Sequence, residues 1–167
     1  KIRFKRTKKN SKNFVPTLNV IDEVLKNYKK LGYKFRYVCC LYPASPFITS
    51  NILKKAFKKI KKNKYDILIP VSKFSSNIWK SFYLSKNGLL KYNFPKNSKT
   101  SSQFLADSYY DTGQWYFFKL KKNKIFRTLL KKKIGSLIIT SLLTQDINTL
   151  EDWKIAKVKY KSFFQKK

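Results

Sequence analysis

The chain has 167 residues, of which 43% are hydrophobic and 17% aromatic, so it can form one domain with its own core and is not a disordered tail. It contains no histidine, which excludes Ser-His-Asp and Cys-His catalysis and histidine-ligated zinc. No apolar run is long enough to cross a membrane and no signal-peptide pattern opens the chain, so we expect a cytoplasmic protein without a membrane partner.

The formal net charge of +31 raises the question of nucleic-acid binding. Only four of the 39 basic residues are arginine, and the lysines occur in every segment of the chain. Base recognition and bidentate phosphate binding usually depend on arginine. We therefore predict no specific nucleic-acid binding, and keep a basic nucleic-acid-binding module as a less favoured alternative. An anionic small substrate would be attracted by the same charge.

The first half of the chain predicts alternating helices and strands. Apolar spacing indicates a helix over 16–30 with Gly32 as its C-cap, and a buried strand over 35–42. Ser50 is expected to cap a second helix, and 65–71 reads as a second strand. Strand, helix and strand with short links predict a right-handed crossover in a parallel sheet. Cys39 and Cys40 are adjacent on the first strand, which favours reduced, packed thiols over a disulfide.

The second half begins with a hairpin signal. Asn87 and Gly88 separate two short apolar runs, 82–84 and 89–92, and a polar segment follows over 95–102. Further strands are expected over 113–120 and 136–140, with a short helix or turn over 126–132 between them. Thr149 and Asp152 form a variant capping box that opens a final helix. Its expected inward side chains are Leu150, Trp153, Ala156, Tyr160 and Phe163.

A loop with two prolines, Pro43 and Pro46, links the first predicted strand to the second helix. Each proline fixes its own φ angle and restricts the residue before it. Ligands of open α/β sheets bind at the loops that leave the carboxyl ends of parallel strands. The loop therefore suggests a shaped substrate wall, and the alternative is a rigid turn without chemistry.

Two later segments carry polar groups in positions that suit binding. The stretch 109–116 places Asp111, Gly113 and Gln114 at the start of a strand, where glycine allows close approach and glutamine can both donate and accept. The alternative is an ordinary turn. Asp146 and Asn148 stand two residues apart just before the final helix, and oxygen ligands at this spacing suit Mg²⁺. The alternative is a helix-entry loop in which the aspartate accepts from backbone N–H groups.

Four stretches, taken together and in order, resemble the pseudaminic acid cytidylyltransferases, relatives of the CMP-sialic acid synthetases. That family has a Cys-Leu-Tyr-Pro-x-x-Pro-Phe loop, then Ser-Gln-Asp-Leu, then Tyr-x-Asp-x-Gly-Gln-Phe-Tyr, and finally Gln-Asp-Ile-Asp-Thr-x-Glu-Asp-Trp. The counterparts here are residues 40–47, 102–105, 109–116 and 145–153. The resemblance runs over nearly the whole chain.

The resemblance implies an α/β, Rossmann-like nucleotidyltransferase fold, with a mostly parallel sheet, helices on both faces and a protruding hairpin arm. Residues 1–167 would form a single partial domain, and the arm, about 82–108, would exchange between the subunits of a homodimer. The implied reaction transfers CMP from CTP to a nine-carbon 2-keto sugar acid with Mg²⁺ as cofactor, and releases pyrophosphate. Asp146 and Asn148 would hold the metal. The implied substrate-binding residues are Tyr42, Pro43, Ser45, Gln103, Tyr109, Asp111, Gly113, Gln114 and Tyr116.

The chain also departs from the family pattern. The family's phosphate loop has no counterpart here and would precede Lys1. Asn148 replaces a carboxylate, Ser101 replaces an arginine, and Phe104 replaces an aspartate. These replacements favour a second interpretation, a degenerate, non-catalytic homologue that binds a sugar or a partner subunit.

Overall fold

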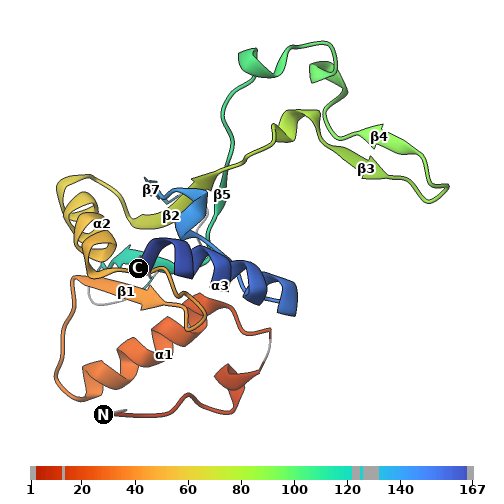
Figure 1. Ribbon diagram of the computed structural model, residues 1–167. Coiled ribbons are helices and arrows are strands. Elements are labelled where there is room, and N and C mark those ends of the chain that lie inside the picture. Colours follow the sequence, from red (N-terminus) through yellow and green to blue (C-terminus); the bar gives the residue numbers. More distant parts are fainter. Residues whose placement is uncertain (1–2, 13, 122–124, 126–131, 165–167) are drawn as a thin grey trace.

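The computed structural model describes residues 3–12, 14–121, 125 and 132–164. Figure 1 shows a body in which a sheet is packed between helices, and an arm that projects away from it. The described elements include five short 3₁₀ helices as well as the helices and strands discussed below. The 3₁₀ helices are Lys9–Ser11, Ile78–Lys80, Pro95–Asn97, Ser102–Phe104 and Ser141–Leu143.

The first two helices form where the sequence predicts them. Helix α1 is Thr17–Lys30, and Gly32 follows it with φ +84°, a left-handed conformation that suits glycine. Helix α2 is Ser50–Lys62, but Ser50 is not its cap. The Thr49 hydroxyl accepts from the Ile52 backbone N–H at 3.3 Å, because Thr49 is extended and Ser50 is already helical.

The sheet is mixed, which corrects the prediction of a mostly parallel sheet. Strand β6 pairs antiparallel with both β1 and β2, and β5 pairs antiparallel with β2. Only the ladder between β2 and β7 is parallel among the described strands. The β1–α2–β2 crossover does join two strands that run in the same direction. These two strands do not pair with each other, because β6 lies between them. The strands are β1 Tyr37–Leu41, β2 Ile67–Lys73, β5 Tyr109–Asp111, β6 Trp115–Lys119 and β7 Ile134–Ile138.

Strands β5 and β6 are two halves of one bent segment. Val71 pairs with Asp111 of β5 and with Ile138 of β7, so β5 and β7 lie on opposite edges of β2. Strand β6 lies on the same edge as β5, because Ile67 pairs with β6 and with β7. The bend falls at Gly113, whose φ of +64° favours glycine. This bend brings the predicted binding residues beside the end of β1.

Helices cover both faces of the sheet, as predicted. Helix α2 packs on one face and α1 on the other, and buried apolar side chains of β2 and β6 alternate between these two layers, as strand geometry requires. The α2 layer contains Ala56, Ile60, Leu68, Trp115, Phe117 and Ile139, and the α1 layer contains Ile21, Leu25, Ile67, Phe118 and Leu120.

Helix α3, Leu150–Phe164, begins with the predicted capping box. The Asp152 backbone N–H donates to the Thr149 hydroxyl at 3.2 Å, and the Thr149 N–H donates to the Asp152 carboxylate at 2.9 Å. Of the five side chains expected to point inward, Ala156 is buried, but Leu150, Trp153, Tyr160 and Phe163 are all exposed, so these four expected positions are wrong.

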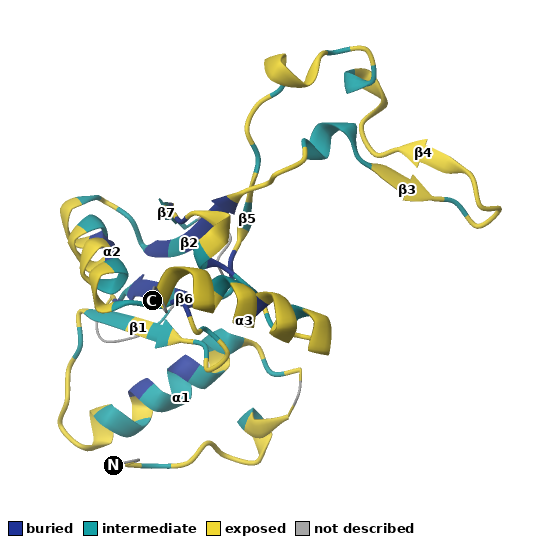
Figure 2. Cartoon of the chain, viewed as in Figure 1, coloured by how far each residue is buried: buried dark blue, intermediate teal, exposed yellow. Residues whose placement is uncertain are grey.

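The predicted hairpin forms and makes the tip of the arm. Strands β3, Phe82–Leu84, and β4, Leu90–Tyr92, pair antiparallel around Gly88, whose φ is +80°. Figures 1 and 2 show the hairpin far from the body, with every residue of both strands exposed. The helix or turn predicted over 126–132 falls, except for its last residue, outside the described residues.

The cysteines and the apolar character of the helices can be examined in the described part of the chain. Both cysteines are free thiols. None of the helices among the described residues combines the length and the apolar character that a membrane span requires.

Candidate functional site

Three of the four predicted binding segments meet at one end of the sheet. Strands β1, β2 and β7 run in the same direction, so their carboxyl ends share an edge. The proline loop leaves β1 there, and the segment with Asp146 and Asn148 follows β7. Strand β6 starts at the same edge with Trp115, directly after the bend. This is the edge at which α/β proteins bind ligands.

Gln114 joins the proline loop to the segment that follows β7. Its carbonyl oxygen accepts from the Tyr42 backbone N–H at 3.0 Å and from the Ser45 hydroxyl at 3.3 Å. Its side-chain amide donates to the Leu143 carbonyl at 2.9 Å, and the residue is only 2% exposed. A buried amide that is hydrogen-bonded in this way fixes the relative positions of the two loops. The predicted contact of Gln114 with a sugar stays a prediction.

Tyr42, Asp111 and Tyr116 line a common cavity of about 320 Å³. The Tyr116 hydroxyl donates to one Asp111 carboxylate oxygen at 2.9 Å, and the Gly113 N–H donates to the other at 2.9 Å. The rings of Tyr42 and Tyr116 meet edge to face at 5.6 Å, and the Tyr42 hydroxyl is hydrogen-bonded to Thr17 of α1. Three segments that are far apart in sequence therefore build one polar wall.

The electrostatics of this wall assign donor and acceptor. Burial, followed by the hydrogen bond to Asp111, raises the pKa of the Tyr116 phenol well above its usual value. The phenol therefore stays protonated at neutral pH and remains the donor to Asp111. The Asp111 carboxylate is held by two donors but stays exposed to solvent, so it has lone pairs left to accept from a ligand.

Asp146 and Asn148 are both exposed and contact each other. The Asn148 side-chain amide donates to the Asp146 carboxylate at 2.9 Å. The backbone N–H groups at the entry of α3 are bound by Asp152 instead, which accepts from Asn148 at 3.1 Å and from Thr149 at 2.9 Å. The carboxylate of Asp146 is thus not used to cap the helix.

The oxygen atoms of Asp146 and Asn148 can be compared with the ligands that Mg²⁺ requires. Within the described ranges, no three or more His, Cys, Asp or Glu side chains gather as a metal cage. Mg²⁺ in nucleotide enzymes commonly takes only one or two carboxylates and completes its shell with water and substrate phosphates. One carboxylate with a neighbouring amide oxygen fits that pattern.

The other predicted residues are not gathered in the cavity. Gln103 lies in the 3₁₀ helix Ser102–Phe104 of the arm, and its side chain is exposed. Tyr109 stands on β5 opposite Lys73, and Pro43 is an exposed residue of the proline loop. Figure 1 shows how the arm carries its residues away from the body.

Sequence reasoning missed several groups that organise the site. The Tyr110 hydroxyl is hydrogen-bonded to the Thr144 hydroxyl at 3.3 Å, which ties β5 to the segment before α3. The Leu143 carbonyl is a backbone group and has no signature in the sequence. Lys159 contacts three oxygens of the same segment, but its only sequence signal is a lysine among many.

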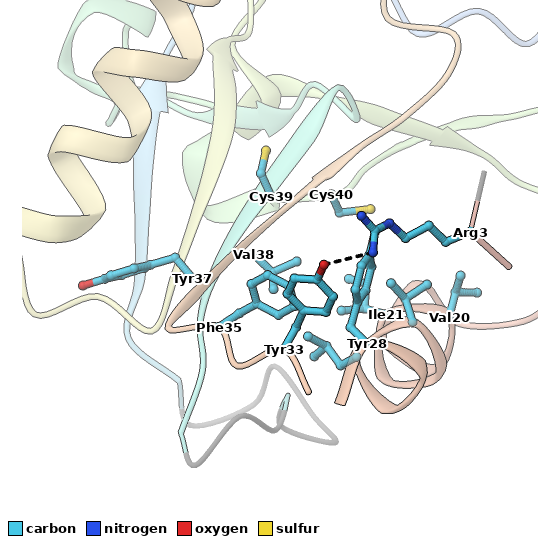
Figure 3. A pocket seen from close by; sticks show the side chains of 12 residues that line it. Arg3, Val20, Ile21, Tyr28, Tyr33, Phe35, Tyr37, Val38, Cys39 and Cys40 are labelled. Carbon is cyan, nitrogen blue, oxygen red and sulfur yellow. Dashed lines mark hydrogen bonds between the residues drawn. The ribbon is translucent and has the colours of Figure 1, made fainter. Parts of the chain in front are cut away.

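A second cavity of about 530 Å³ lies between α1 and β1, and its lining is also mostly apolar. Figure 3 shows that aromatic and aliphatic side chains surround it, and that the Arg3 guanidinium donates to the Tyr33 hydroxyl, at 3.0 Å. Cys39 and Cys40 of β1 also line it. None of the predicted binding residues does, so the cavity at Asp111 remains the candidate site.

Comparison with known proteins agrees with the motifs. No protein-family model matches the chain. Two curated proteins from Campylobacter jejuni subsp. jejuni, of serotypes O:23/36 and O:2, are each 29% identical to it over 158 residues. These matches cover 95% of this chain and 68% of each relative.

A solved structure, 4-diphosphocytidyl-2C-methyl-D-erythritol synthase from Anaerococcus prevotii, superposes on 89% of this chain and 77% of its own. The TM-score of this superposition is 0.47, and the sequence identity is 10%.

The matched relatives are cytidylyltransferases, so the chain is a homologue of nucleotide-transferring enzymes. More particularly, both of the Campylobacter proteins are pseudaminic acid cytidylyltransferases, which confirms the resemblance carried by the four motifs.

Proposed function

We propose that the protein containing this chain transfers CMP from CTP to a nonulosonic acid of the pseudaminic type and releases pyrophosphate. The observation that supports this most is the cavity between α1 and the sheet, which reaches the carboxyl ends of the strands where Tyr42, Asp111 and Tyr116 meet. In the reaction, the anomeric hydroxyl oxygen of the sugar bonds to the α-phosphorus as the bond to pyrophosphate breaks and the hydroxyl proton is released. Positioning and charge neutralisation are the main needs of such a transfer.

The few polar side chains of the cavity suit the hydroxyl and amide groups of the sugar. Asp111, held by Tyr116 and Gly113, is an acceptor and binds O–H or N–H donors. It would repel the sugar's own carboxylate, which therefore points away from Asp111. The net charge of +31 attracts both anionic substrates to the protein.

We propose that Asp146 and Asn148 hold Mg²⁺ together with the phosphates of CTP. The ion, when bound, would neutralise charge on the phosphates. Asp146 would give a carboxylate oxygen. Asn148 would turn its amide oxygen toward the same point, giving up the present hydrogen bond to Asp146.

We propose that the working unit is a homodimer built through the arm. Leu84 and Leu90 of the hairpin are 68% and 66% exposed, and aromatic residues beside them are exposed as well. A contiguous apolar surface of this kind indicates a protein interface. Gln103 is on the same arm, so its contact with a sugar would occur in the site of the partner subunit.

The test is pyrophosphate release from CTP and Mg²⁺ with pseudaminic, legionaminic or N-acetylneuraminic acid. We expect release with at least one acid, and a loss of about a hundredfold in kcat/KM for Asp111→Asn, because the variant amide replaces an ionised acceptor. Lys154→Met, on the exposed surface of α3, is the matched control. Absence of release with all three acids would refute the proposed reaction.

A second candidate function is a non-catalytic homologue that binds the sugar acid. Asn148 favours it, since a neutral amide that donates to Asp146 is a poorer metal ligand than a carboxylate. This function predicts that a sugar acid raises the melting temperature while no pyrophosphate is released. Restoring the carboxylate with Asn148→Asp would then increase metal binding.

A further inference from the structure

The segment that carries Asp146 has no regular structure of its own. It follows the 3₁₀ helix Ser141–Leu143 and runs over 144–148 to the start of α3. Fixing the backbone of each such residue costs conformational entropy. A segment that presents ligands therefore needs other groups to hold it in place.

Lys159, two turns into α3, contacts this segment at three points. Its ammonium group donates to the Ser141 carbonyl at 3.1 Å, to the Thr144 carbonyl at 2.8 Å and to the Gln145 side-chain oxygen at 3.0 Å. These contacts use all three N–H donors of a lysine. Lys154, Lys157 and Lys161 of the same helix are exposed, whereas Lys159 is half-buried.

Asp152 lies seven residues earlier, on the same face of α3, and holds the other end of the segment. Its carboxylate accepts from the backbone of Asn148 and Thr149 and from the Thr149 hydroxyl, at 3.1, 2.9 and 2.8 Å. Gln145 connects the two anchors, because its side-chain amide nitrogen donates to Asp152 at 3.2 Å while its oxygen accepts from Lys159. Asp146 therefore lies in a segment held at both ends.

We infer that Lys159 is a positioning residue, which acts with Asp152 to hold the 141–149 segment in the conformation that presents Asp146. The ammonium group of Lys159 donates to three neutral oxygens of the segment. Its role therefore differs from that of exposed lysines, whose charge attracts substrate. The role of Lys159 in holding the segment follows from its hydrogen bonds, whereas metal binding at Asp146 rests on the proposed function.

The experiment compares the unmodified protein with Lys159→Met, which keeps the aliphatic stem and removes the donors. Lys154→Met removes an exposed lysine of the same helix and is the matched control. We expect amide hydrogen exchange over 144–148 to become about tenfold faster in Lys159→Met and to stay unchanged in the control. Lys159→Arg, which can still donate to several oxygens, should restore part of the protection.

Binding of Mn²⁺, followed by electron paramagnetic resonance, gives a second readout. Changes in the groups that orient metal ligands commonly weaken binding by about 10–100-fold, and we expect the Mn²⁺ Kd of Lys159→Met to rise by about tenfold. Asp146→Asn should abolish the binding. Absence of Mn²⁺ binding to the unmodified protein would refute the proposed metal site, and the exchange measurement would still decide the role of Lys159.

Lys159→Met with the same exchange as Lys154→Met would overturn the inference. If Lys159→Met does not fold, Gln145→Leu serves as the second variant, because it removes one acceptor of Lys159 and the donor to Asp152 but leaves the two carbonyl contacts of Lys159. We expect it to increase exchange over 144–148 in the same direction but by less, and unchanged exchange would again overturn the inference.

Discussion

The substitution Gln114→Leu tests how the site is held together. It replaces the buried glutamine side chain by an apolar one of similar size. The change removes the amide nitrogen that donates to the Leu143 carbonyl oxygen at 2.9 Å in the unmodified protein. A net hydrogen bond is worth about 1 kcal/mol, and an acceptor left unsatisfied costs about 1–3 kcal/mol. Because the introduced leucine regains part of this through its apolar surface, we expect a loss of about 2 kcal/mol in the free energy of unfolding.

The loss is measured by urea unfolding followed through tryptophan fluorescence, since Trp115, the next residue, is fully buried. For a chain of this size, a loss of about 2 kcal/mol lowers the melting temperature by about 4–8 °C. Gln103→Leu is the matched control, because it makes the same change at an exposed glutamine of the arm and should cost less than about 0.5 kcal/mol. Equal stability of the two variants would refute the role given to the Leu143 contact.

Gln114→Glu adds a dependence on pH. The introduced carboxyl can donate to Leu143 only when protonated, and burial raises its folded pKa above the ordinary value of about 4.3. Because the unfolded state then ionises first, the stability of this variant relative to the unmodified protein should fall as pH rises from 4 to 7. A difference that is flat with pH would show that the side chain does not remain in its buried site.

Three further predictions concern other parts of the molecule. A Cβ at Gly135 would overlap the Tyr65 ring, so Gly135→Ala should lower the free energy of unfolding by about 1–3 kcal/mol, and adding Tyr65→Leu should recover part of it in a double-mutant cycle. Hydrogen bonds from Thr149, together with the Asn148 N–H, lower the pKa of Asp152 below its ordinary 3.8. Stability from Asp152 is therefore complete above pH 3.8 and is lost as pH falls through the folded pKa. Protection of the 144–148 amides, taken relative to their intrinsic exchange rate at each pH, should therefore fall on acidification from pH 5 to 3, and less so in Asp152→Asn. Leu90→Asp on the arm should convert a dimer into monomers in sedimentation analysis, because it places a charge in the proposed interface.

Local signals in the sequence were sufficient for most individual elements. The apolar spacing of 16–30 gave α1, the Asn87-Gly88 pair gave the β3–β4 hairpin, and Thr149 with Asp152 gave the start of α3. These features depend on residues within a few positions of one another, so propensity, turn geometry and capping decide them. The Thr49 cap of α2 was missed because two neighbouring hydroxyl residues give the same signal.

The sequence by itself determined most of the helices and strands, the four motifs and the resemblance to cytidylyltransferases, but it did not predict β5 as a strand. Only the tertiary structure decided that β6 lies antiparallel between β1 and β2, because strand order depends on pairing between distant segments, which a crossover pattern does not specify. It also decided that Gln114 uses its amide on Leu143, that Tyr116 donates to Asp111 and that Lys159 holds the segment around Asp146. In each of these contacts the hydrogen-bond partner is determined by how the chain packs. Polar groups that packing removes from water must then find a hydrogen-bond partner within the protein.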